Sequence, residues 1–264
     1  YQTTAFNSDG FTVVDQTNGG YGVNGAAGQT FSGTNAYYVA WNWKAGGTAV
    51  SNTDGTITSQ VSANVDAGFS IVKFTSNAST LTAGHGLNSI PDLIIVKATS
   101  FADSWFVNSS ALTNQTDRAL RLNATSAEET NSAFWNNVAP TSTTFSLGNG
   151  ISINGNSYIA YCFKSISGYS KVGSYVGTGA TGNVQYLGFE PAFLLVKRTS
   201  SASDWYMIDN KRNPSNPRNS WLNANTSTAE YTPSHGVDFL SNGFSFISTD
   251  LNGTGQSWIF LAIA

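Results

Sequence analysis

The sequence predicts an all-β fold made of tandem, jelly-roll-like β-sandwich domains of about one hundred residues each. Composition is the first reason: only 10% of the 264 residues are charged, 13% are aromatic, and 26 are glycine. Thr, Val, Ile and aromatic side chains suit a pleated sheet, whereas Gly, Asn and Asp suit the turns between strands. An internal repeat is the second reason, because it divides the chain into units that can each bury a core.

The repeat is clearest in two segments whose residue numbers differ by 100 and which align without a gap. Residues 91–105 have the sequence PDLIIVKATSFADSW, and residues 191–205 have the sequence PAFLLVKRTSSASDW. The same spacing relates Leu122-Asn123-Ala124 to Leu222-Asn223-Ala224. Such agreement predicts two copies of one structural unit.

Residues 1–46 are similar to the last third of this unit. SDGFTVVD at 8–15 is similar to SNGFSFIS at 241–248, and YVAWNWK at 38–44 is similar to YIAYCFK at 158–164. We therefore predict that residues 1–46 are the C-terminal part of a preceding repeat unit. We also expect the chain to be a fragment of a longer protein.

Residues 47–66 are rich in Gly, Ser, Thr and Asn and poor in large apolar side chains. Such a composition is typical of a linker. We predict a linker here, with at most one short edge strand.

Residues 67–166 and 167–264 are predicted to form the first and second sandwich, with six or seven short strands each. The runs Leu93–Val96 and Phe193–Val196 are continuously apolar, which is typical of a strand buried on both faces. Tight turns are predicted where a Gly can adopt positive φ. These turns are Asp9-Gly10, Asp54-Gly55, Asn154-Gly155, Asn242-Gly243 and Asn252-Gly253.

Charge and hydropathy exclude several classes of partner. The net charge is −3 and the isoelectric point is near 5.2, so there is no basic surface with which to neutralise phosphates, and nucleic acid is not an expected partner. The longest apolar runs are far shorter than the roughly 20 residues of a membrane-spanning helix, so we expect no membrane insertion. The single cysteine, Cys162, cannot form an internal disulfide.

The histidines and the densest charged run do not form a recognisable site. At the repeat spacing His85 faces Gln185 and His235 faces Trp135, and no second His or Cys stands at the spacing of a metal site. We expect both histidines at the surface or in turns. In the run from Asp209 to Arg212 we expect these two residues to pair across a turn.

The carboxylates do not repeat either. Asp92, Asp103 and Glu190 face Ala192, Ser203 and Ile90 in the other unit. A glycosidase needs two carboxylates across a cleft. A glycosidase site confined to a single unit remains an alternative. No nucleophile motif, phosphate-binding loop or calcium loop is present in the sequence. We expect no catalytic residue, no metal and no cofactor.

Aromatic residues are the remaining candidates for ligand binding, because Trp and Tyr faces bind sugar rings. Five tryptophans recur in the other unit or face large apolar residues there, and we expect them in the core. These are Trp41, Trp43, Trp105, Trp205 and Trp258. Trp135 and Trp221 face His235 and Arg121 and have polar neighbours, so they are the candidates for an exposed ligand-binding surface, with a buried position at a sandwich edge as the alternative.

Four strings resemble a known family. They are YVAWNWKAGGTAVSNTDGTITSQVSANVDAGFSIVKFT, SYIAYCFKSISGYSKVGSYVGTG, DWYMIDNKR and DFLSNGFSF. The family is a repeated, uncharacterised β domain of tail-fibre-like structural proteins in tailed phages, often found beside concanavalin-A-like lectin domains. The resemblance covers almost the whole chain, from Ser8 onward. It implies no catalytic residues and a location in the virion or otherwise outside the cell.

The resemblance implies a non-enzymatic virion structural protein, similar to a tail fibre or adhesin, that contacts host surface glycans or proteins. Its other expected partners are further virion proteins and copies of itself, with a homotrimer favoured by analogy with fibres. The alternative is a decoration or spacer protein of a capsid, tail or filament that binds no receptor. A polysaccharide-degrading tail enzyme is the third possibility.

Overall fold

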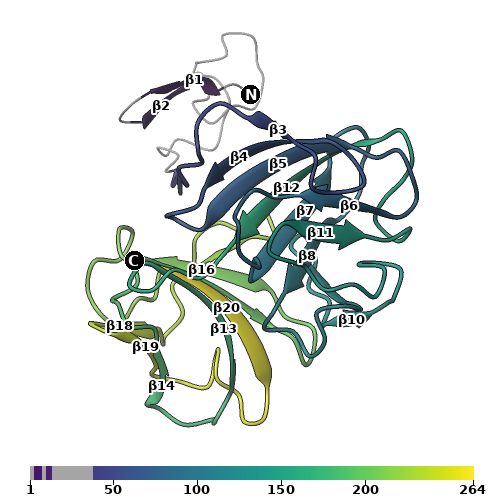
Figure 1. Ribbon diagram of the computed structural model, residues 1–264. Helices are drawn as coiled ribbons and strands as arrows, with labels where there is room; N and C mark the ends of the chain where they lie inside the picture. The colour runs from purple at the N-terminus through teal and green to yellow at the C-terminus, as the bar shows by residue number, and fades with distance from the viewer. Residues whose placement is uncertain (1–2, 8–9, 14–37) are drawn as a thin grey trace, which may run out of the picture. The chain divides into compact units, whose positions relative to one another are not determined.

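A computed structural model describes residues 3–7, 10–13 and 38–264 of the chain. Every regular element in these residues is a β-strand, and the strands pair antiparallel within each sheet (Figure 1). The all-β prediction is therefore confirmed. The chain forms two compact units, Tyr1–Trp43 and Lys44–Ala264, which are described separately.

In the first unit, β1 (Thr3–Asn7) pairs antiparallel with β2 (Gly10–Val13). The break after Trp43 falls close to the predicted boundary at residue 46. The prediction that residues 1–46 end a preceding repeat falls largely on residues 14–37, which lie outside the described residues.

The second unit begins with a large sheet around the first repeat. Its strand order is β10-β9-β8-β7-β12-β5-β4-β3, and a smaller sheet pairs β11 with β6. Their bounds are β3 (Val50–Asn52), β4 (Ser59–Asn64), β5 (Phe69–Thr75), β6 (Leu81–Gly84), β7 (Leu93–Ala98), β8 (Trp105–Ser109), β9 (Arg118–Arg121), β10 (Glu129–Thr130), β11 (Thr144–Leu147) and β12 (Ser157–Phe163).

The prediction of a linker at 47–66 is wrong. β4 pairs with β5 over its whole length, and β3 pairs with β4, so this segment extends the first sheet by two strands. Val61 on β4 is only 3% exposed and belongs to the hydrophobic core. Two of its apolar residues, Ile57 and Val61, are spaced so that both reach the core, and this burial supports the pairing.

The second repeat has the same central strand order. The order β5-β12-β7-β8-β9 of the first repeat returns as β13-β20-β15-β16-β17, and the smaller sheet is β14-β19-β18. Their bounds are β13 (Ser170–Val176), β14 (Asn183–Tyr186), β15 (Phe193–Arg198), β16 (Trp205–Asp209), β17 (Leu222–Asn223), β18 (Val237–Leu240), β19 (Gly243–Phe246) and β20 (Ser257–Ile263).

Each repeat has eight strands, not the predicted six or seven, because strands as short as β10 and β17, with 2 residues each, leave no periodic pattern in the sequence.

Each repeat has its own hydrophobic core, drawn from both of its sheets, as in a sandwich. The apolar runs on β7 and β15 are buried on both faces, as predicted: Ile94 and Leu194 belong to the two cores, and Ile95 and Leu195 on the opposite faces are also buried. Cys162 is buried in the first core, where loss of solvation raises the pKa of its thiol to about 12. The thiol is therefore protonated and unreactive.

The predicted turns use their glycines differently from the prediction. Gly155 has a φ of 80°, whereas Gly10, Gly55, Gly243 and Gly253 do not have positive φ. A Cβ at Gly55 or Gly243 would collide with the carbonyl oxygen of a neighbouring strand, so there the glycine allows a close backbone approach. Asp9 lies outside the described residues.

The alignment of the two Leu-Asn-Ala triplets is also wrong in three dimensions. The Trp105 amide donates to Asn123 Oδ1, but the Trp205 amide donates to Asn225 Oδ1, at 2.9 and 2.8 Å. Strand pairing agrees, because Phe106 pairs with Arg121 whereas Tyr206 pairs with Asn223. The second repeat therefore has two additional residues before β17. Structural equivalents differ by 102 from β9 to residue 129, and by 100 again at β12 and β20.

Candidate functional site

The two candidates for an exposed ligand-binding surface, Trp135 and Trp221, are buried. They are 2% and 3% exposed and belong to the two cores. The Nε1 of Trp135 donates to the carbonyl of Arg118 at 2.7 Å, and that of Trp221 donates to the carbonyl of Arg218 at 3.1 Å. Each ring thus satisfies a backbone carbonyl within its own repeat, from a position that has no aromatic counterpart in the other repeat. The prediction that they form a ligand-binding surface is wrong.

Trp105 is the reverse case. Trp205 and Trp258 are buried as predicted, at 2% and 1% exposed, but Trp105 is only half-buried and stacks on Tyr161 with an interplanar angle of 13°. Trp41 and Trp43 are also half-buried. The repeat correctly showed that Trp105 and Trp205 are equivalent, but not that their surroundings differ.

The two histidines have different environments. His235 is exposed, as predicted, and its Nδ1 lies 3.5 Å from Asp250 Oδ2. His85 is fully buried, contrary to the prediction: its Nδ1 accepts from the Leu87 amide at 3.2 Å and its Nε2 lies 3.2 Å from the Thr141 carbonyl. Burial lowers the pKa of His85, despite opposing effects of the Thr141 carbonyl and Asp54. This histidine closes a loop and is neutral.

The predicted pair of Asp209 and Arg212 is confirmed, with 2.7 Å between Asp209 Oδ2 and Arg212 Nε. Burial alone would raise the pKa of Asp209, but hydrogen bonds from the Arg212 amide and guanidinium and from the Lys211 amide outweigh it and lower the pKa. Arg212 also pairs with Glu230 at 2.6 Å. The run therefore holds a strand end in place.

The carboxylates singled out in the sequence do not come together in one site. Asp92 accepts from Lys164 Nζ at 3.1 Å and from the Ser165 amide at 2.8 Å. Asp103 accepts from the Ser104 amide at 2.7 Å, and Glu190 is exposed. Among the described residues, no group of three or more His, Cys, Asp or Glu could hold a metal ion.

The junction between the repeats is the feature that sequence reasoning missed. The loop 121–128 of the first repeat lies against the β15–β16 connection of the second. Four hydrogen bonds join them: Trp205 Nε1 to Arg121 O at 2.9 Å, Lys197 Nζ to Thr125 O at 3.2 Å, the Ser203 amide to Thr125 O at 2.8 Å, and the Glu128 amide to Thr199 O at 2.9 Å. Five backbone groups take part: the carbonyls of Arg121, Thr125 and Thr199 and the amides of Ser203 and Glu128. The residue pattern therefore does not show these contacts.

Lys197 is the unusual residue of this junction because it is an ammonium with 0% exposure. Its Nζ donates to two carbonyls, those of Thr125 and Arg198, and meets no carboxylate at salt-bridge distance. Burial, helped by the charge of Arg198 and opposed by Asp204, lowers its pKa to about 8. Its equivalent Lys97 makes only the second kind of bond, to Ala98 O at 2.8 Å.

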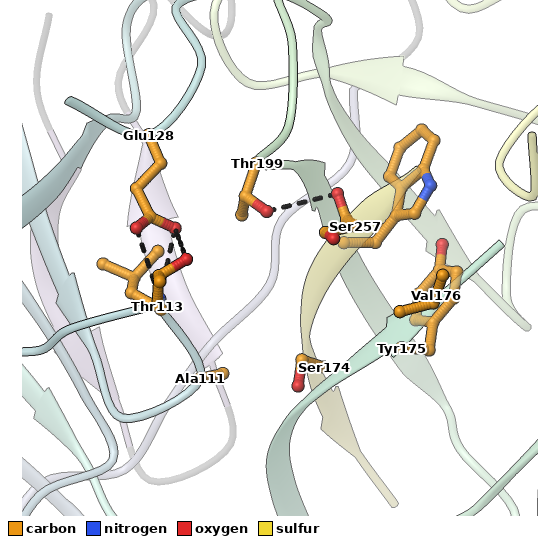
Figure 2. Close-up of a pocket in the computed structure, with 10 residues that line it drawn as sticks. Ala111, Thr113, Glu128, Ser174, Tyr175, Val176, Thr199 and Ser257 are labelled. Atoms are coloured by element: carbon orange, nitrogen blue, oxygen red, sulfur yellow. Dashed lines mark hydrogen bonds between the residues drawn. The ribbon is translucent and has the colours of Figure 1, made fainter. Parts of the chain in front are cut away.

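A groove of about 400 Å³ opens beside this junction. One wall comes from the first repeat and the other from the second, and Figure 2 shows Glu128 and Thr113 facing Thr199, Ser257 and Ser174 across it. The lining residues are Ala111, Leu112, Thr113, Glu128, Ser174, Tyr175, Val176, Thr199, Ser257 and Trp258.

The chemistry of the groove is that of hydroxyl groups and one carboxylate. Glu128 already accepts from the amide and hydroxyl of Thr113 at 3.2 to 3.3 Å, and its Oε1 lies 3.6 Å from Arg118 Nε (Figure 2). The lining contains no second carboxylate with which a glycosidase pair could form. Such a groove can hydrogen-bond a polar, hydroxyl-rich ligand.

Searches among curated proteins and among solved structures found no significant match. No helix among the described residues is long and apolar enough to cross a membrane. One family model, DUF7483, described as a domain of unknown function, matches residues 1–264. With its whole length matched, the chain belongs to the DUF7483 family.

Proposed function

We propose that the chain is a non-enzymatic structural module of a tailed-phage virion, in which two tandem jelly-roll-like sandwiches act as a spacer or decoration element. The junction of the repeats is the observation that carries this proposal. A buried Lys197, a buried Trp205 and four hydrogen bonds join the repeats, as a rigid spacer requires. The tailed-phage context rests on the sequence resemblance.

This order of candidates reverses the one that the sequence favoured. A receptor-binding fibre tip needs an exposed recognition surface, and the two tryptophans that were to supply it are in the cores. The extracellular location fits a chain with 10% charged residues and many uncharged hydrogen-bonding side chains.

The proposal is tested on particles and on host surfaces. Mass spectrometry and immunogold labelling of purified particles, made by cells that carry the coding sequence, should find the chain on the virion. The purified chain should show no saturable binding to host cells or to an array of bacterial surface glycans. Absence from the particles, release of oligosaccharides from host polysaccharide, or saturable glycan binding would contradict the spacer function.

Glycan binding in the groove is a second candidate, supported by the hydroxyl-lined walls in Figure 2. Ser174 is exposed on β13, and Ser174→Trp would fill the groove. Lys73→Trp is the matched control, because Lys73 is the exposed equivalent of Ser174 on β5 and does not line the groove. Groove binding predicts a glycan signal that Ser174→Trp abolishes and Lys73→Trp retains.

A further inference from the structure

Each side of the junction has a structural equivalent on the other repeat, and this equivalent makes no such contact. On the first repeat the counterpart is a face around Lys97, Thr99, Asp103 and Trp105, here called the open face. On the second repeat it is the loop 223–230, here called the free loop. We propose that the free loop of one copy of the chain binds the open face of a second copy.

Burial at equivalent positions shows that the open face is uncovered. Lys197, Thr199 and Trp205 are 0%, 8% and 2% exposed, because the loop 121–128 covers them. Their equivalents in the first repeat are half-buried at Lys97 and Trp105 and exposed at Thr99. The second repeat is present when these residues are exposed to this extent. It therefore does not cover the open face.

The free loop matches the loop that covers the second repeat. With the structural offset of 102, Thr125 corresponds to Ser227 and Glu128 corresponds to Glu230; the Ala-Glu pair at 127–128 recurs at 229–230. Residues 226–230 are all exposed, whereas four of their five equivalents in 124–128 are half-buried and Thr125 is exposed. The loop is therefore available in the second repeat and used in the first.

The polar groups that make the junction are free on both counterparts. Within the described residues, Trp105 Nε1, the Asp103 amide and the Thr99 carbonyl make no hydrogen bond on the open face. The same holds for the Ser227 carbonyl and the Glu230 amide on the free loop. The junction pairs the equivalents of these groups, so the contact between two copies continues an interface that already exists inside the chain.

Each copy has one open face and one free loop, so the contact is heterologous. It extends beyond a dimer into a closed ring or an open chain, according to the rotation between copies. The inference does not depend on the proposed function, because it uses only the geometry of the junction. Inside one chain the connected loop and face have an effective concentration of the order of 1 mM. A contact that forms there needs a dissociation constant below about 1 mM, so assembly between copies is expected below that concentration.

Sedimentation velocity of the full chain, from about 1 µM to about 1 mM, tests the proposal. The wild type should form species larger than a dimer as its concentration rises. Trp105→Phe removes the Nε1 donor and keeps the ring, and together with Lys97→Met it should weaken assembly about tenfold. Tyr186→Ser, at a site 67% exposed and outside both counterparts, is the control and should assemble like the wild type.

A complementation experiment separates this contact from any other. Thr99→Trp blocks the open face and Ala229→Trp blocks the free loop, and both positions are exposed, so the fold tolerates the substitutions. Each variant alone should stay monomeric, and their mixture should form a 1:1 dimer and nothing larger. The proposal would be overturned if the wild type stays monomeric at about 1 mM or if the blocked variants still assemble. It would also be overturned if the open face binds a glycan and no second copy of the chain.

Discussion

Trp105 and Trp205 occupy the same position in two copies of one unit, yet one is half exposed and the other is buried. Both rings lie at the start of the same strand of the unit. Their exposure differs because the loop 121–128 covers Trp205 and does not cover Trp105. Conversely, Trp135 and Trp221 occupy different positions in the alignment, yet both are buried and both donate to a backbone carbonyl of their own repeat. At the scale of residues, therefore, recurrence in the sequence predicts the fold but not the exposure.

Lys197 makes the stability of the chain depend on pH in an unusual direction. Its pKa is lowered to about 8 in the folded state and returns to about 10.5 on unfolding, so between these values the unfolded chain binds more protons. The free energy of unfolding should therefore rise with pH from about 8 to about 10.5, by about 3 kcal/mol at most.

Urea unfolding of the wild type and of Lys197→Met at pH 7, 8, 9 and 10 measures this effect. The free energy of unfolding of the wild type should rise relative to that of Lys197→Met as the pH rises, because Met does not titrate. Curves that stay parallel over this range would show that Lys197 is not desolvated in the folded protein.

At the scale of elements, the segment 47–66 shows how sheet pairing overrides composition. Its Gly, Ser and Thr content is that of a linker, but β4 needs only Val61 in the core and a backbone ladder to β5. The loop 121–128 is a similar case, because its carbonyls and amides make the contacts that hold the repeats together.

Val61→Ala tests whether the segment is structural. It removes a side chain that is 3% exposed, and the lost burial and remaining cavity should cost about 2 kcal/mol of unfolding free energy. Val50→Ala is the control, because Val50 is the partner of Val61 on β3 and is 64% exposed. Chemical denaturation of both variants checks the result, and equal small effects would mean that the segment behaves as a linker.

At the scale of the whole molecule, residues 44–264 form one compact unit with two hydrophobic cores. The sequence predicted two domains in succession, and the cores agree with that division. The junction, however, buries groups of the second repeat that would be exposed in an isolated domain. Stability should therefore be shared between the repeats.

Urea unfolding of the chain should accordingly show one transition for residues 44–264, with the same midpoint by circular dichroism and by tryptophan fluorescence. Val96→Ala and Val196→Ala, at equivalent and fully buried sites of the two cores, should each move the whole transition to lower urea with little change in slope. Two separate transitions in Val196→Ala would mean that the repeats unfold independently.

The sequence alone determined the strand-rich composition, the repeat and the buried apolar strands such as β7 and β15, because these follow from side-chain hydropathy and spacing along the chain. It also determined the pair of Asp209 and Arg212, which are close in sequence. Only the tertiary structure decided that Trp135 and Trp221 are buried, that Trp105 is half exposed, and that residues 47–66 belong to the sheet. It also decided the groove and the junction, because these depend on backbone groups and on contacts between segments far apart in the chain, which residue patterns do not record.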